Sequence, residues 1–154
     1  MQEADSRIDV QYAVNTNAIP AAELLRCWAD QALQGRHPAA ELALRIVDEA
    51  EMTALNRQYR GKDGVTNVLS FPFEAMPGVE TEQLGDIVIC APVVATEAVT
   101  QGKPIEAHWA HMVIHGVLHL LGHDHHHEAE AQEMESLEVR LLASLGFPDP
   151  YQPG

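Results

Sequence analysis

The strongest constraint on the fold of this chain is a histidine-rich run, HGVLHLLGHDH, at residues 115–125. Its first two histidines, His115 and His119, are four residues apart. On an α-helix that spacing places both rings on one face, about 6 Å apart along the axis. Gly122 follows three residues later, where a left-handed residue can end the helix and reverse the chain. Because the returning chain can bring His125 toward the other rings, the run predicts three converging imidazoles.

Three neutral imidazoles around one point, with a fourth position open to water, are typical of a catalytic zinc site. We therefore predict that His115, His119 and His125 bind one Zn²⁺ per chain, although nickel, cobalt or iron could occupy the same nitrogens. The spacing is that of the metzincin proteases, but Gly116 replaces the glutamate that follows their first histidine. The run thus predicts the ligands of a zinc hydrolase without the base of a peptidase.

The sequence does not identify the general base that would accept the proton of the attacking water. Asp124 lies one residue before the third histidine, but it can equally cap the last helix or orient a ligand. Glu128 is a weaker candidate, because a glutamate in the first turn of a helix needs no further explanation. A substrate phosphate or a metal-bound hydroxide could also remove the need for a protein base.

The histidines are concentrated, since eight of the nine fall between His108 and His127. His108 and His111 precede the motif at helical spacing and could be partners of the ligands, but we favour ordinary core or surface positions for them. We interpret His126 and His127 as solvated residues at the start of the last helix, and His123 as an exposed turn residue.

The densest group of cations, Arg57, Arg60 and Lys62, lies in the segment LNRQYRGKDGVTNVLSFPFE. On composition alone, the dipole of a helix end explains cations there. We nevertheless single out Arg60, because a fixed guanidinium facing a phosphate binds it in bidentate fashion and stabilises charge in a transition state. A peptide substrate has less need of such an arginine.

Overall charge limits the partners of the chain. The net charge of -14 argues against nonspecific binding to nucleic acid, which depends on Lys and Arg. No apolar run reaches the roughly 18 residues that span a bilayer, and no signal peptide is evident. Cys27 and Cys90 lie in different apolar segments, and we expect both to be reduced core residues. A cytoplasmic protein without a membrane partner is therefore expected.

Length and hydrophobic periodicity predict an α+β fold in one domain, residues 1–154, with a C-terminal tail at about 147–154. Strands are predicted over residues 7–14, 41–48, 67–71 and 84–92, and helices over residues 20–33, 49–60, 93–101, 104–122 and 128–145. The order βαβαββααα indicates one mixed sheet of about four strands with helices packed on it, and the metal motif lies on the longest helix.

Three segments, LNRQYRGKDGVTNVLSFPFE, LGDIVIC and HGVLHLLGHDH, together resemble the YbeY family of bacterial endoribonucleases, the rRNA maturation factors, over roughly residues 40–146. The resemblance implies one zinc held by His115, His119 and His125. It implies single-strand-specific RNA cleavage in maturation of the 16S rRNA 3′ end and in ribosome quality control. It also implies that Arg60 is a catalytic or phosphate-binding residue. One position departs from the family pattern, because an aromatic residue is expected where His123 stands.

The leading hypothesis is thus a zinc-dependent endoribonuclease in which Arg60 and His115 are catalytic. Its expected partners are single-stranded RNA or rRNA and the small ribosomal subunit or its proteins. Since so acidic a chain should bind naked RNA weakly, we predict that a ribosomal protein or another partner delivers the substrate. The nucleophile that attacks the phosphorus of the RNA can be a metal-bound water or a ribose 2′-hydroxyl, and the sequence does not choose between them. Two other functions also stay open: another metal-dependent hydrolase, acting on peptides or amides, and a non-catalytic ribosome-associated zinc protein.

Overall fold

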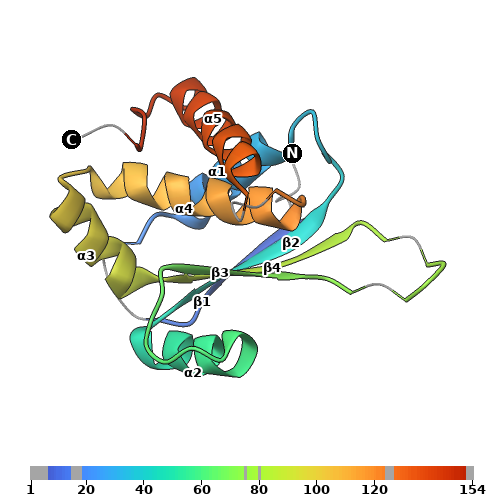
Figure 1. The fold of residues 1–154 in the computed structure, drawn as a ribbon, viewed down its shortest axis with the longest axis horizontal. Coiled ribbons are helices and arrows are strands. Elements are labelled where there is room, and N and C mark those ends of the chain that lie inside the picture. Colours follow the sequence, from blue (N-terminus) through green and yellow to red (C-terminus); the bar gives the residue numbers. More distant parts are fainter. Residues whose placement is uncertain (1–6, 15–18, 75, 80, 124–126, 152–154) are drawn as a thin grey trace.

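The computed structural model describes residues 7–14, 19–74, 76–79, 81–123 and 127–151 (Figure 1). Its strands are β1 (Ile8–Tyr12), β2 (Glu41–Val47), β3 (Val68–Pro72) and β4 (Gln83–Cys90). Its helices are α1 (Ala22–Leu33), α2 (Glu49–Arg60), α3 (Ala91–Gln101), α4 (Ile105–Leu120) and α5 (Glu128–Ser144). The element order along the chain is the predicted one, which confirms the α+β fold.

The strands form one mixed sheet in the order β1–β2–β4–β3. β1, β2 and β4 run parallel, and β3 pairs with β4 in the antiparallel direction. β3 is therefore an edge strand, as its closing proline, Pro72, predicts, because proline cannot donate to a strand ladder.

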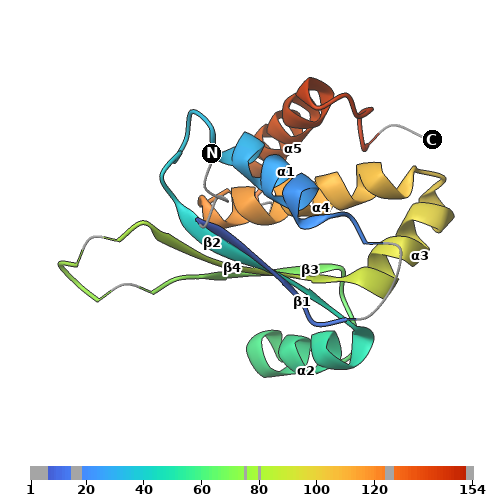
Figure 2. The same ribbon diagram turned by 180° about the vertical axis from the view of Figure 1, so that it is seen from behind.

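Helices cover the two faces of the sheet unequally (Figures 1 and 2). α1, α4 and α5 lie over one face, α2 lies against the other, and α3 links the end of β4 to α4. The larger core fills the space under α1, α4 and α5, and it includes Leu44, Ile46, Ile87, Ile89, Ile114 and Leu118. A smaller apolar cluster lies under α2 and consists of Val47, Met52, Leu69, Val88 and Cys90.

α4 is the central helix of the covered face, in contact with α1, α3, α5, β3 and β4. Its sequence is apolar on nearly all sides, and a helix of that kind must be buried on all sides. The helix ends as predicted: Gly122 has a φ of +103°, and the N–H of His123 donates to the carbonyl of Leu118 at 3.0 Å. This is the Schellman arrangement that turns a chain back at a helix end.

The two cysteines are both free, as predicted, but they differ in burial. Cys90 is buried at the end of β4, whereas Cys27 is exposed on α1, so its prediction as a core residue was wrong. Trp28, the next residue along α1, takes the buried position instead. None of the described helices is long and apolar enough to cross a membrane.

Candidate metal centre

α4 brings His115 and His119 together, as their spacing predicts. Their ring centroids are 4.6 Å apart, and the ring planes meet at 77°. Both side chains are half-buried, whereas residues 116–118 between them are buried. The pair is therefore the part of this stretch of α4 that a ligand can reach.

A buried carboxylate from α5 holds the first of these rings. Glu138 is fully buried, and its Oε2 lies 2.6 Å from Nδ1 of His115. A ring nitrogen that bonds to an ionised carboxylate carries the proton, so this contact keeps the proton on Nδ1 and the lone pair on Nε2. Carboxylate–histidine contacts of this kind orient the histidine ligands of metal sites. His115 is thus held in the form that can bind a metal through Nε2.

Glu138 is also the centre of a wider network. Its Oε1 accepts hydrogen bonds from Nε2 of His111, at 3.0 Å, and from the hydroxyl of Tyr151. Burial by itself raises the pKa of the Glu138 carboxyl, but the hydrogen bonds from His111 and His115 outweigh it and lower the pKa to about 2. Burial and the adjacent Glu138 raise the pKa of Tyr151 far above its usual value, so its hydroxyl keeps the proton that it donates.

Glu138 and Tyr151 were not predicted as site residues. Glu138 had a signal in the sequence, because it lies among the buried residues Met134, Leu137 and Leu141 of α5 at helical spacing. A lone carboxylate in such a stripe needs buried partners. Tyr151 belongs to the C-terminal tail predicted at about 147–154, and nothing in its local sequence points to Glu138.

The histidines that precede the pair are buried, as the core alternative for them predicts, but they are also partnered. His111 shares Glu138 with His115, so it belongs to the site rather than to the core alone. His108 bonds through Nε2 to Glu97 of α3 at 2.8 Å. Burial lowers the pKa of His108, and the contact with Glu97 offsets part of that change.

A second set of possible ligands overlaps the predicted one. Atoms of His111, His115 and Glu138 lie within 4.8 Å of one another, close enough to surround a metal ion. Their contacts of 2.6 and 3.0 Å are hydrogen-bond lengths, however. Ligand atoms of a tetrahedral zinc are about 3.3 Å apart, given bonds of about 2.0 Å. The observed geometry therefore favours Glu138 as the residue that orients His115, and the donors of His115 and His119 fit zinc chemically.

Packing explains why a glycine replaces the protease glutamate. A Cβ atom at Gly116 would lie 2.7 Å from Cγ2 of Ile87 on β4, which is closer than carbon atoms can approach. The carbonyl of Gly116 also accepts a hydrogen bond from Ser70 on β3, at 3.2 Å. A side chain at this position would point into the sheet and not toward the rings, so it could not act as the base.

The remaining motif residues are less informative. His125 and Asp124 lie outside the described residues, so the third ligand and one candidate base stay predictions. Glu128 is exposed in the first turn of α5, and His127 is exposed at the start of that helix, as predicted. His123 is half-buried rather than exposed.

Arg60 is separated from the histidine pair. It is the last residue of α2, which ends where the helix predicted over residues 49–60 ends, and it is exposed; Gly61 follows with a φ of +65°. α2 and α4 lie on opposite faces of the sheet (Figures 1 and 2). The structure therefore does not bring Arg60 beside His115 and His119, and its role stays a prediction.

An α+β fold that presents two histidines of one helix, backed by a buried carboxylate, defines a candidate metal-dependent hydrolase. Residues 9–146 match the family described as Endoribonuclease YbeY, and the chain belongs to that family. Its members are nucleases, hydrolases that cut phosphodiester bonds within RNA. The match extends about thirty residues further toward the N-terminus than the resemblance predicted from the sequence.

Solved structures support the fold. The solution structure of TM1509 from Thermotoga maritima is similar with a TM-score of 0.59 and 22% sequence identity. The similarity covers 94% of this chain and 99% of that chain. At this identity the likeness concerns the arrangement of strands and helices, and it agrees with the mixed sheet described above.

Proposed function

We propose that this protein is a zinc-dependent, single-strand-specific endoribonuclease that acts in maturation of the 16S rRNA 3′ end and in ribosome quality control. Membership in the YbeY family supports the nuclease activity. The hydrogen bond between Glu138 and His115 is the observation that carries the metal dependence, because it holds the ring in a metal-binding form. His119 and, by its spacing, His125 are the other proposed ligands.

In this proposal His115 and His119 hold the metal through ring nitrogens. Zinc, when bound, supplies a Lewis acid for the phosphate and lowers the pKa of a water molecule. Glu138 keeps the proton of His115 on Nδ1, and its complete burial excludes bulk water from that hydrogen bond. Packing argues against a base at position 116. Asp124 and Glu128 stay the candidate proton acceptors, beside a substrate phosphate or a metal-bound hydroxide that would make a protein base unnecessary.

Arg60 is proposed to be a catalytic or phosphate-binding residue, as the family resemblance implies. It is exposed at the end of α2, the helix that covers the opposite face of the sheet from α4, where it can bind a phosphate of the RNA strand (Figure 1). Binding at a second point of a flexible strand still promotes cleavage, because it reduces the freedom of the scissile bond.

We further propose that a component of the small ribosomal subunit in the cytoplasm delivers the RNA. The net charge of -14 supports this, since affinity for phosphates depends on Lys and Arg. Binding to free RNA and to small subunits should be titrated at rising salt. We expect weak binding to free RNA and a gain from the subunit. Tight, salt-sensitive binding to free RNA with no gain from the subunit would contradict the proposal.

The test of the proposed site compares His115→Ala with Arg60→Glu. We expect His115→Ala to lose both zinc, measured by elemental analysis, and cleavage of single-stranded RNA. Arg60→Glu should keep its zinc and lose cleavage. An Arg60→Glu variant with full activity would remove this residue from the mechanism, and a His115→Ala variant with full zinc would remove the ligand assignment.

A further inference from the structure

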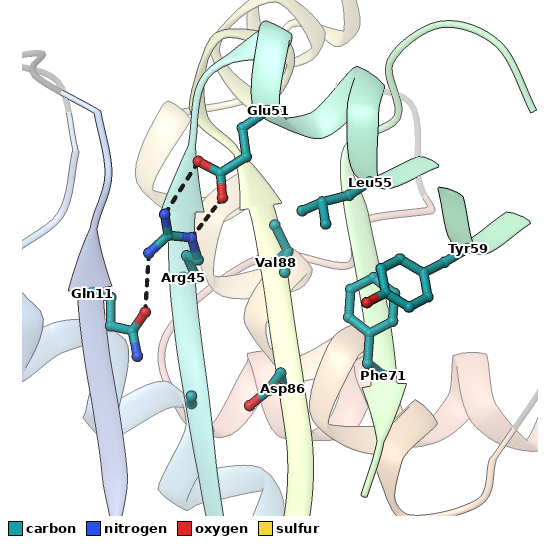
Figure 3. Close-up of a pocket in the computed structure, with 9 residues that line it drawn as sticks. Gln11, Arg45, Glu51, Leu55, Tyr59, Phe71, Asp86 and Val88 are labelled. Atoms are coloured by element: carbon teal, nitrogen blue, oxygen red, sulfur yellow. Dashed lines mark hydrogen bonds and ion pairs between the residues drawn. The ribbon is translucent and has the colours of Figure 1, made fainter. Parts of the chain in front are cut away.

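A cavity of about 300 Å³ lies between α2 and the sheet, on the face opposite the histidine pair (Figure 3). Its lining comes from α2 and from all four strands. We propose that this cavity, the α2 groove, binds one base of the single-stranded RNA substrate, stacked on Tyr59 and Phe71. The proposal deepens the proposed function, because it rests on RNA as the substrate.

An aromatic pair at one end of the α2 groove provides the stacking surface. The ring centroids of Tyr59 and Phe71 are 4.7 Å apart and the planes meet at 60°. Tyr59 is 59% exposed, and Phe73, two residues beyond Phe71, is 50% exposed. Bases of single-stranded RNA stack on exposed aromatic side chains irrespective of sequence, because every base has a π-face. The pair is thus suited to a base, and packing within the protein does not explain why Tyr59 is exposed.

The polar groups in the α2 groove suit a base better than a phosphate. Arg45 donates through Nε to Glu51 at 2.6 Å and through Nη1 to Gln11 at 3.1 Å, so its charge is largely neutralised. Asp86 lines the same cavity and is exposed (Figure 3). A carboxylate repels phosphate, but it accepts hydrogen bonds from the amino group of cytosine. The interior of the groove therefore favours the base itself.

Cations for the RNA backbone lie next to the α2 groove. Arg57, Arg60 and Lys62 are exposed at the end of the helix that carries Tyr59. They make up three of the nine Lys and Arg residues of the chain. In a protein of net charge -14, this is where a phosphate backbone meets positive charge.

The edge strand explains how one RNA strand can reach both sites. Side chains alternate along β3: Leu69 and Phe71 face α2, whereas Ser70 bonds to the carbonyl of Gly116 on α4. β3 is the last strand of the sheet, so an RNA strand can pass around it from the α2 groove to the histidine pair. Arg60 then binds a phosphate on the path between the stacked base and the cut site.

The test measures stacking without cleavage, in a His119→Ala background at low ionic strength. The probe is a single-stranded oligoribonucleotide that contains 2-aminopurine, whose fluorescence is quenched when the base stacks. We expect quenching with Tyr59 and with Tyr59→Phe, which keeps the ring. Tyr59→Leu should lose the quenching and bind about 5-fold to about 150-fold more weakly. Quenching and affinity equal to the parent in Tyr59→Leu would overturn the proposal.

A second comparison tests the role of Asp86. Oligo(C) should bind more tightly than oligo(U), because cytosine has an amino group where uracil has a carbonyl oxygen. Asp86→Asn should reduce the difference in affinity between oligo(C) and oligo(U). Equal binding of the two oligonucleotides to the parent protein would contradict the orientation of the base that we propose.

The outcomes separate this proposal from the proposed function. With metal-loaded protein, Tyr59→Leu should raise the KM for RNA and leave kcat at saturating RNA unchanged. If the protein with Tyr59 binds and stacks RNA but does not cut it, the proposed nuclease mechanism fails while the α2 groove stands. If Tyr59→Leu leaves RNA binding unchanged but weakens binding to the small ribosomal subunit, the groove binds a protein and our proposal is overturned.

Discussion

The two faces of the sheet differ in how they hold their charged groups. Under α4, Glu138 is fully buried and its oxygens are occupied by His111, His115 and Tyr151. Against α2, the side chains of Arg45 and Glu51 are 40% and 32% exposed, and they form an ion pair in contact with solvent. Electrostatic interactions are stronger in a low-dielectric interior than at a surface. The covered face can therefore hold a histidine ring in one fixed geometry, whereas the open face leaves its charged groups accessible to solvent.

Strand alternation produces this difference from one stretch of sequence. On β4, Ile87 and Ile89 belong to the core under α4, whereas Val88 belongs to the cluster under α2. Asp86, one residue before Ile87, lines the α2 groove. Successive side chains of a strand point to opposite faces, so the same eight residues build a closed core and an open binding surface.

The largest effect is expected from Glu138→Gln on the covered face. The amide has the shape of the carboxylate, but it carries no charge and offers one acceptor oxygen instead of two. We expect zinc affinity, measured by competition with a chelator, to fall about 10-fold to 100-fold. Glu135→Gln is the matched control, because Glu135 is exposed on the same helix. Equal zinc affinity in both variants would mean that Glu138 does not orient a ligand.

Gly116→Ala tests the packing of the same face. The new Cβ would lie 2.7 Å from Cγ2 of Ile87, and overpacking of this kind costs about 1–3 kcal/mol. Better helix propensity offsets up to about 1 kcal/mol. We expect a net loss of free energy of unfolding in urea titrations. The double variant Gly116→Ala/Ile87→Ala should lose less unfolding free energy than the two single variants lose together, because removing the Ile87 side chain relieves the clash. A loss equal to the sum of the single losses would contradict the contact.

Tyr151→Phe should have a smaller effect, because Tyr151 is 46% exposed. The variant loses the hydroxyl that donates to Glu138, and we expect it to lose about 1 kcal/mol of stability. Its zinc affinity should fall by less than tenfold. Tyr59→Phe, which removes an exposed hydroxyl on the other face, is the control and should change neither quantity. Wild-type values for Tyr151→Phe would show that the tail does not support the site.

The smallest effect is expected from Arg45→Lys on the open face. Lysine cannot reproduce the two contacts of the guanidinium with Glu51, but exposed ion pairs contribute only about 0.2–1 kcal/mol. The unfolding free energies of the variant and of the parent protein should converge as the salt concentration rises, because salt screens the ion pair. A loss above about 2 kcal/mol at either salt concentration would break the distinction between the two faces.

Local periodicity accounts for what could be predicted from the sequence. The spacing of His115 and His119 placed both on one helix face, and Gly122 marked its end, because these are properties of one continuous segment. Glu138 and Tyr151 reach the site from other segments, through packing that no local spacing encodes. The separation of Arg60 from the pair also depends on which face α2 covers, and the pattern of α2 does not specify that.

The most direct test of the account measures zinc content and RNA cleavage together. Wild type, His119→Ala and His127→Ala, whose histidine is exposed at the start of α5, should be compared on the same single-stranded rRNA. We predict one zinc per chain and cleavage for wild type and His127→Ala, and neither for His119→Ala. Equal cleavage by all three proteins would contradict the account, because the activity would then not depend on the histidine pair of α4.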